Sequence, residues 1–227
     1  MKFKHFILLV AFTTCFVTTS HSQHKTYDIV NGFGIMAGVS LYDIKTDNFT
    51  TKQGTGFAGG MSATLDLPHK GYTVSYGMQL SDNNIQISGR MTDDVVGNEM
   101  LEYKLLAVQL GLYYHKKILG DNLTIDLGPQ LQYNSKLELK DENQEGYFIN
   151  NYDSLTAKEI ESISQFNVNG LIGVSAGIGA IKIRAQYIYG FLNILDKLND
   201  KNLNVGNNTD EFKGNQSMLV FVAMFSF

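Results

Sequence analysis

The chain has little cysteine and little proline. Cys15 is the single cysteine among 227 residues, and it lies in an apolar N-terminal segment. If that segment is removed on export, the remaining chain can form no disulfide, thiolate metal site or cysteine nucleophile. A chain without cysteine also has no thiol that an oxidising compartment could oxidise. The 2 prolines contrast with 22 glycines, many of which lie inside strand-like runs, where glycine marks bends or crowded interiors.

No apolar run is long enough to cross a bilayer as a helix. The longest run near the N-terminus, Phe6–Phe12, is too short for a span. Two lysines precede it, and small residues at the −3 and −1 positions fit cleavage by signal peptidase after Ser22. We therefore expect residues 1–22 to be a signal peptide and residues 23–227 to form one domain.

Positive charge and histidine are also scarce. The formal net charge is −4, and loss of residues 1–22, which contain two lysines and no acidic residue, would make it −6. No basic stripe is visible, which argues against a nucleic-acid partner. Beyond Ser22 the histidines are His24, His69 and His115, and no metal-ligand spacing surrounds them. We expect no metal and no cofactor.

The sequence does contain many segments that alternate between apolar and polar residues. In Ile181–Tyr189 the odd positions are apolar or aromatic, and the even positions begin Lys182, Arg184, Gln186. Side chains alternate across a strand, so this pattern predicts a strand with one apolar and one polar face. Eight such strands are predicted, at about 32–42, 55–67, 72–81, 101–115, 123–139, 166–178, 181–189 and 215–227.

Three irregularities are expected along these strands and their connections. The alternation changes phase near Leu105-Leu106, which predicts a β-bulge. Pro129 has no amide N–H, so a bulge or a broken ladder is expected there. Asp153-Ser154 can cap a short helix over Leu155–Ile163, inside the longest connection.

The connections alternate in length without exception. The short ones are residues 68–71, 116–122 and 178–180; the long ones are residues 43–54, 82–100, 140–165 and 192–214. Short periplasmic turns and long outer loops are typical of up-and-down barrels in bacterial outer membranes. The sequence thus predicts an all-β, eight-stranded antiparallel up-and-down transmembrane β-barrel.

A soluble barrel with a lipid-like ligand inside would also alternate. Its polar face would meet water and carry Lys and Glu. Here the polar face is mostly Gly, Ser, Thr, Asn and Gln, which suit a lumen with room only for side chains. Aromatic residues near strand ends resemble the girdles of membrane barrels; they are Phe33, Tyr72, Tyr114, Tyr133, Phe166, Tyr189 and Phe227. These features favour the membrane barrel.

Several charged residues fall on the polar faces. They could form an ion pathway or bind an anion, or they could pair into a network that plugs the lumen. Buried charge is costly unless it is paired, which favours the plug. The predicted charge network consists of Asp66, Asp126, Lys136, Glu138, Lys182 and Arg184.

No catalytic group is expected. Lipid-modifying enzymes of the outer membrane need a nucleophile and a base near the outer leaflet. The predicted topology places all three histidines at or near the periplasmic side, so no Ser-His-acid group can assemble on the outer side.

Four segments follow one another along the chain: a Leu-rich strand at Leu105–Leu110, the pair Gly128-Pro129, the stretch Tyr187–Ile194, and a terminal strand that ends in Phe227. In this order they resemble the PorT-type outer-membrane β-barrel family of Bacteroidota. The chain departs from the family pattern at Gln109, where Pro is common, and at Gln186, where Arg is common. The resemblance implies an outer-membrane barrel, and its founding member is tied to protein secretion across the outer membrane. The pattern is structural, so it implies no site residues.

The resulting expectation is a monomeric barrel in outer-membrane lipid with a structural or binding role. Its terminal Phe227 would be the signal read by the barrel-assembly machinery. A narrow pore for ions or small solutes, and an accessory of protein secretion, are the alternatives.

Overall fold

The computed structural model describes residues 30–92, 99–206 and 211–227. The predicted signal peptide and its cleavage site therefore lie outside the described residues. In the described part of the chain, no helix has both the length and the apolar character needed to cross a membrane.

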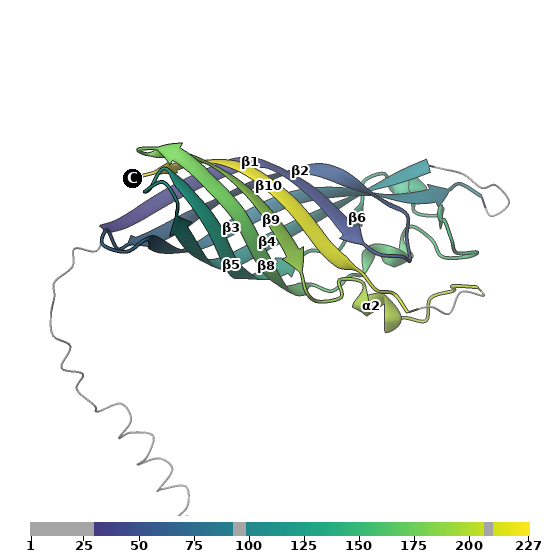
Figure 1. Ribbon diagram of the computed structural model, residues 1–227. Helices are drawn as coiled ribbons and strands as arrows, with labels where there is room; N and C mark the ends of the chain where they lie inside the picture. The colour runs from purple at the N-terminus through teal and green to yellow at the C-terminus, as the bar shows by residue number, and fades with distance from the viewer. Residues whose placement is uncertain (1–29, 93–98, 207–210) are drawn as a thin grey trace, which may run out of the picture.

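Eight long antiparallel strands form a closed ring (Figure 1). Each strand pairs with the next in chain order, and the first pairs with the last. The strands of the ring are β1 (Val30–Lys45), β2 (Thr51–Asp66), β3 (Tyr72–Arg90), β4 (Glu99–Lys117), β5 (Leu123–Asn134), β8 (Phe166–Ile178), β9 (Ile181–Gly190) and β10 (Asn215–Ser226). The predicted fold class, an eight-stranded antiparallel up-and-down barrel, is confirmed.

The alternation along β9 shows which face points outward. Ile181 and Ile183 are 62% and 65% exposed, whereas Arg184, the residue after Ile183, is only 3% exposed. Gln186 is buried on the same inner face, and Tyr187 is exposed. The apolar face of the strand is thus the outside of the barrel, and the polar face lines its lumen.

The same rule gives the whole ring an apolar outer belt. Aromatic side chains gather at both ends. At the short-turn end, Phe33 contacts Phe227 at 5.4 Å between ring centroids, and Tyr72 stacks on Tyr114 at 5.2 Å. Towards the long-loop end, Tyr133 and Phe166 are exposed and paired in register. Large apolar residues exposed between these ends include Ile35, Val39, Met61, Tyr76, Leu80, Val108, Leu110, Leu112, Leu127, Leu131, Ile172, Val174 and Phe221. An apolar band flanked by aromatic girdles is the exterior of an outer-membrane β-barrel.

The strands extend further than predicted at the end with the long loops. β3 continues to Arg90 and β4 starts at Glu99, so most of the predicted loop 82–100 is a β-hairpin. The reason is a second apolar core: Ile85 and Ile87 point inward with 0% and 1% exposure. Polar neighbours in the sequence hide this alternation.

The expected irregularity at Pro129 is present as a broken ladder, whereas the one expected near Leu105-Leu106 is absent. The predicted bulge near Leu105-Leu106 is wrong, because β3 and β4 pair in one unbroken register. The observed irregularity is in β2, between Gln53 and Phe57. A side chain at Gly54 would place its Cβ 2.2 Å from the Asn84 carbonyl oxygen, so this close approach requires glycine. At Pro129 the β4–β5 ladder is interrupted without a change of register.

The long connection after β5 is compact but contains little helix. Two short strands, β6 (Glu138–Leu139) and β7 (Phe148–Ile149), extend the sheet along β4 and β3. The helix predicted over Leu155–Ile163 is reduced to a single 3-10 turn, η2 (Glu159–Glu161). The remaining short elements are η1 (Glu142–Gln144), in the same connection, and α2 (Asp196–Asn199), between β9 and β10.

Candidate functional site

The middle of the lumen is filled by amides that hydrogen-bond across it. Gln132 Nε2 on β5 donates to Gln216 Oε1 on β10 at 2.8 Å, and Gln132 Oε1 accepts from Asn169 Nδ2 at 2.7 Å. Gln216 Nε2 closes the triangle by donating to Asn169 Oδ1 at 2.8 Å. All three side chains are at most 2% exposed. Strands β5, β8 and β10 are therefore joined through the interior as well as around the ring.

A second polar group lies along the opposite wall. Ser40 Oγ donates to Asn83 Oδ1 at 2.9 Å, and Asn83 Nδ2 donates to Ser81 Oγ at 2.8 Å. Gln109 Nε2 also donates to Ser81 Oγ, at 3.0 Å. Between these two polar groups, the inner faces of β1 and β10 also carry buried apolar side chains. They belong to Met36, Met218, Val220, Val222 and Met224.

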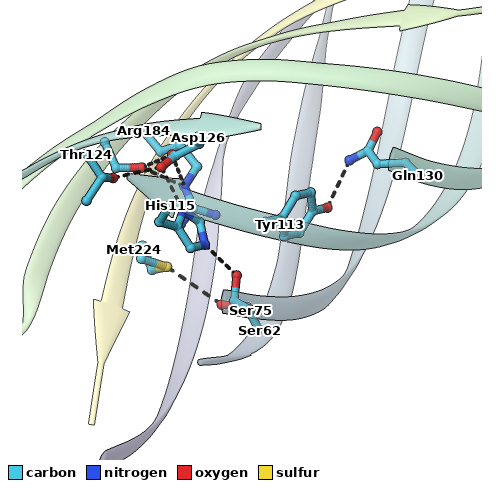
Figure 2. Close-up of polar contacts among 10 residues, drawn as sticks. Ser62, Ser75, Tyr113, His115, Thr124, Asp126, Gln130, Arg184 and Met224 are labelled. Carbon is cyan, nitrogen blue, oxygen red and sulfur yellow. Dashed lines mark hydrogen bonds and ion pairs between the residues drawn. The ribbon is translucent and has the colours of Figure 1, made fainter. Parts of the chain in front are cut away.

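Towards the end with the short turns, the lumen contains a buried charge centre around Asp126 (Figure 2). Its Oδ1 lies 2.7 Å from His115 Nδ1 and accepts from Thr124 Oγ1 at 2.7 Å. Its Oδ2 accepts from Ser175 Oγ and lies 3.5 Å from Arg184 Nε. Arg184 Nε in turn donates to Ser175 Oγ at 2.9 Å. Each carboxylate oxygen thus has two partners, as a buried carboxylate requires.

His115 extends this centre to a fifth strand. Its Nε2 lies 2.6 Å from Ser75 Oγ on β3, which completes the order Ser75–His115–Asp126 (Figure 2). Sequence reasoning missed this group, although a signal was present: His115 and Asp126 both fall on inward faces and lie opposite each other in the β4–β5 register. Ser75 is 1% exposed and Asp126 is fully buried. The group therefore resembles a catalytic triad in order but lies closed within the lumen.

The six predicted charges do not form one network. The structure brings Asp126 and Arg184 together. Asp66 lies at the mouth of the lumen at the end with the short turns, 2.7 Å from Lys117 Nζ. Lys182 is half-buried close to the same mouth.

Lys136 and Glu138 are exposed, so their predicted place in the lumen is wrong. β5 ends at Asn134, and the chain leaves the strand before β6 begins. The alternation restarts one residue out of phase, so Leu137 and Leu139 point inward. A slip of one residue moves every following side chain to the other face.

At the long-loop end, the loops build an apolar cap over the lumen. Phe212 stacks on Tyr152 at 5.7 Å and contacts Phe49 at 5.8 Å, which joins three connections. Tyr103 Oη donates to the Ala157 carbonyl at 3.0 Å. Arg90 Nη2 donates to the Tyr152 carbonyl at 2.7 Å. The other buried members of the cap are Tyr42, Ile44, Ile85, Ile87, Leu101, Leu105, Leu137, Ile149, Leu155, Ile160, Ile163, Ile194, Leu195 and Leu198.

The outer surface of the cap carries charges of both signs. Lys158 Nζ lies 2.6 Å from Glu145 Oε1, and this hydrogen bond raises the pKa of Lys158. Lys213 lies 2.7 Å from Glu211, and the hydrogen bond lowers the pKa of that carboxyl. Both pairs are exposed, so the cap depends on its apolar interior for stability and very little on them.

Metal ligation finds no support in the described part of the chain, where no group of three or more His, Cys, Asp or Glu side chains could hold an ion. No family model matches the chain, and no curated protein matches it.

Solved structures with a similar fold are found. Neisserial surface protein A is 14% identical, with a TM-score of 0.47, over 86% of this chain and 97% of that chain. Ail, the attachment invasion locus protein of Yersinia pestis, is 10% identical, with a TM-score of 0.49, over 87% and 99%. That Ail structure is a complex with the heparin analogue sucrose octasulfate. At such identities the likeness concerns the fold alone; the ring closure and apolar belt described above establish the outer-membrane barrel.

Proposed function

We propose that this outer-membrane barrel is a closed, non-conducting scaffold that holds a rigid cap at the cell surface for binding. The observation that carries the proposal is the continuity of the buried interior. Cross-lumen amides such as Gln132 and Asn169 fill the middle of the barrel, and the apolar cap covers its long-loop end. Eight strands leave room only for side chains, so little space remains for a solute.

The cap itself supports a binding role. Long loops without a role at the surface would not need a shared apolar core. Residues from four connections or strand extensions nevertheless pack together in the cap. Ordering these segments costs conformational entropy, and their buried apolar area offsets it. A pre-ordered surface loses less entropy when it binds a partner. The partner at this surface would meet a mixed-charge face.

Catalysis does not fit the geometry of the Ser75–His115–Asp126 group. The hydroxyl of a serine nucleophile has to reach a substrate carbonyl, whereas Ser75 is 1% exposed inside the ring. Asp126 also binds Ser175 and Arg184, so it serves as the centre of a structural network. The proposed role is therefore to seal the lumen and stabilise the barrel.

The test is conductance in a planar lipid bilayer. Folded protein, checked by its gel mobility without boiling, is expected to insert and give no discrete current steps. A general porin in the same membrane is the positive control. Reproducible single-channel steps from the folded protein would contradict the closed lumen and favour the narrow pore.

An accessory role in protein secretion is the second candidate. It is supported by the resemblance of Leu105–Leu110, Gly128-Pro129 and Tyr187–Ile194 to PorT-type barrels. In the structure the last of these segments links β9 to the cap, where Ile194 is fully buried. Deletion of the gene would then reduce export of secreted proteins, and normal export in the deletion strain would end this candidate.

Two terminal features complete the proposal. Residues 1–22 would direct export and be removed. Phe227 is 69% exposed on the outside of the barrel, and its backbone pairs with Phe33. An exposed terminal aromatic residue at a strand end is accessible to the assembly machinery.

We further propose that the barrel is monomeric, since the apolar belt is continuous around the ring and needs only lipid to cover it.

A further inference from the structure

A polar cavity of about 150 Å³ opens among the strand ends at the short-turn end of the barrel. Because short turns face the periplasm in such barrels, this is the periplasmic mouth of the lumen. The cavity borders the Asp126 charge centre, because His115, Thr124 and Ser175 also line it. Its lining includes Asp66, Thr73, Asp121, Lys182, Arg184 and Ser226.

Arg184 is the least satisfied group in this cavity. Its side chain is 4% exposed, and Nε is engaged by Ser175 and Asp126. Its Nη1 is buried and has no acceptor within the described residues. Buried donors are normally paired, and an unpaired guanidinium N–H is expensive, so this atom calls for an explanation.

The second cation of the lining, unlike Arg184, has no acidic partner in the described part of the chain. Lys182 lies on β9 two residues before Arg184, on the same inward face, and makes no ion pair with any described residue. The alternation of the strand therefore directs two positive side chains from neighbouring inward positions towards one small cavity.

The acidic residues of the lining, by contrast, already have cationic or hydrogen-bonding partners, and two of them share one lysine. Asp66 and Asp121 both lie 2.7 Å from Lys117 Nζ. Asp126 is saturated by its own four partners. The hydroxyls of Thr73 and Ser226 line the cavity and make no hydrogen bond within the described residues. The donors left without an acceptor in the described residues are thus Arg184 Nη1, the Lys182 ammonium and the two hydroxyls.

We propose that the periplasmic mouth binds a small oxyanion, of the phosphate class, between Arg184 and Lys182. Guanidinium, ammonium and hydroxyl groups are the donors that bind phosphate oxygens, and charge-assisted hydrogen bonds of this kind are strong. The anion would supply the acceptor that the Arg184 guanidinium lacks. The phosphate could be free in the periplasm or belong to a lipid headgroup of the inner leaflet.

Titration of inorganic phosphate into the folded, full-length barrel in an uncharged detergent, followed by isothermal calorimetry, tests the site. Saturable binding is expected, with one anion per chain. Lys182→Gln removes one donor and one charge and should weaken binding about tenfold, the loss of one charge-assisted hydrogen bond. Lys182 has no protein partner to lose, so this variant should fold, as checked by gel mobility.

Lys116→Gln is the matched control. Lys116 lies on the outward face at the same end of the barrel, so its loss changes the net charge equally without touching the cavity. Its phosphate affinity should equal that of the unmodified chain. Equal weakening in both variants would show that only overall charge matters and would overturn the site, as would the absence of saturable binding.

Lipid nanodiscs separate the two sources of phosphate. The titration is repeated in nanodiscs of zwitterionic lipid and in nanodiscs that also contain phosphatidylglycerol. Competition that appears only with phosphatidylglycerol, and that disappears in Lys182→Gln, assigns the site to a lipid headgroup. Unchanged affinity in both membranes assigns it to the free anion.

Discussion

Replacement of Ile172 by arginine should destabilise the folded barrel by about 2–4 kcal/mol, the cost of a cationic residue on the lipid face at mid-depth. Ile172 lies halfway along β8, and its side chain is 53% exposed on the outer belt. If this surface faces acyl chains, the guanidinium must lose its hydration or distort the bilayer. If it faced water, the same substitution would be nearly neutral.

The measurement is the folded fraction in phospholipid vesicles as denaturant is raised, read from gel mobility without boiling. The matched control is Leu119→Arg, which introduces the same side chain in a short turn. Leu119 is 67% exposed at the membrane edge, where arginine costs about 0–1 kcal/mol. Equal effects of the two substitutions would mean that depth in a membrane plays no part.

Asp126→Ala is the second large effect and should destabilise the barrel by about 3–5 kcal/mol, because it leaves the buried guanidinium of Arg184 without its counter-charge. Asp126 is fully buried and holds partners from three other elements of the ring. The denaturant assay described for Ile172 gives the free energy of unfolding for this variant.

The double variant Asp126→Ala with Arg184→Met separates the charge from the packing. Removing both charges of a buried pair is often close to neutral, so at least half of the lost stability should return. If the double variant is as unstable as the sum of its two single variants, the pair is not coupled and the proposed centre of the network is wrong.

The ring could be predicted because period-2 alternation is a local signal. Ile181, Ile183 and Arg184 fall on the faces that the pattern assigns them, and the alternating loop lengths fixed the order of the strands. The ring of strands thus follows from which residues can face lipid and which can share a narrow lumen.

The cap could not be predicted in the same way. Ile85 and Ile87 follow Asp82-Asn83-Asn84, a run that is typical of a turn, so the segment was expected to be a loop. Tyr103 pairs with Ile85 in the β3–β4 register and donates a hydrogen bond to Ala157, which is remote in sequence. A core that forms only when several connections fold together leaves little periodic signal in any one of them.

The charge centre was predicted in part for a related reason. The strand phase correctly placed Asp126 and Arg184 inside, but distances across the lumen depend on strand stagger, which the sequence does not show. Lys136 and Glu138 lie outside the lumen because β5 ends at Asn134 and its alternation does not continue past that residue. The contact of His115 with Asp126 depends on the β4–β5 register, in which the two residues lie opposite each other, and alternation within one strand does not give that register.

The central claim is that apolar side chains of the ring face lipid and polar ones face the lumen. Spin labels at single cysteines along β4, from Leu106 to Leu112, in a Cys15→Ser background, test it most directly. In bilayers, collisions with oxygen, which concentrates in lipid, should be frequent at positions 106, 108, 110 and 112. Labels at positions 107, 109 and 111 should be immobilised and shielded from oxygen. The opposite phase, or no period of two, would contradict the account.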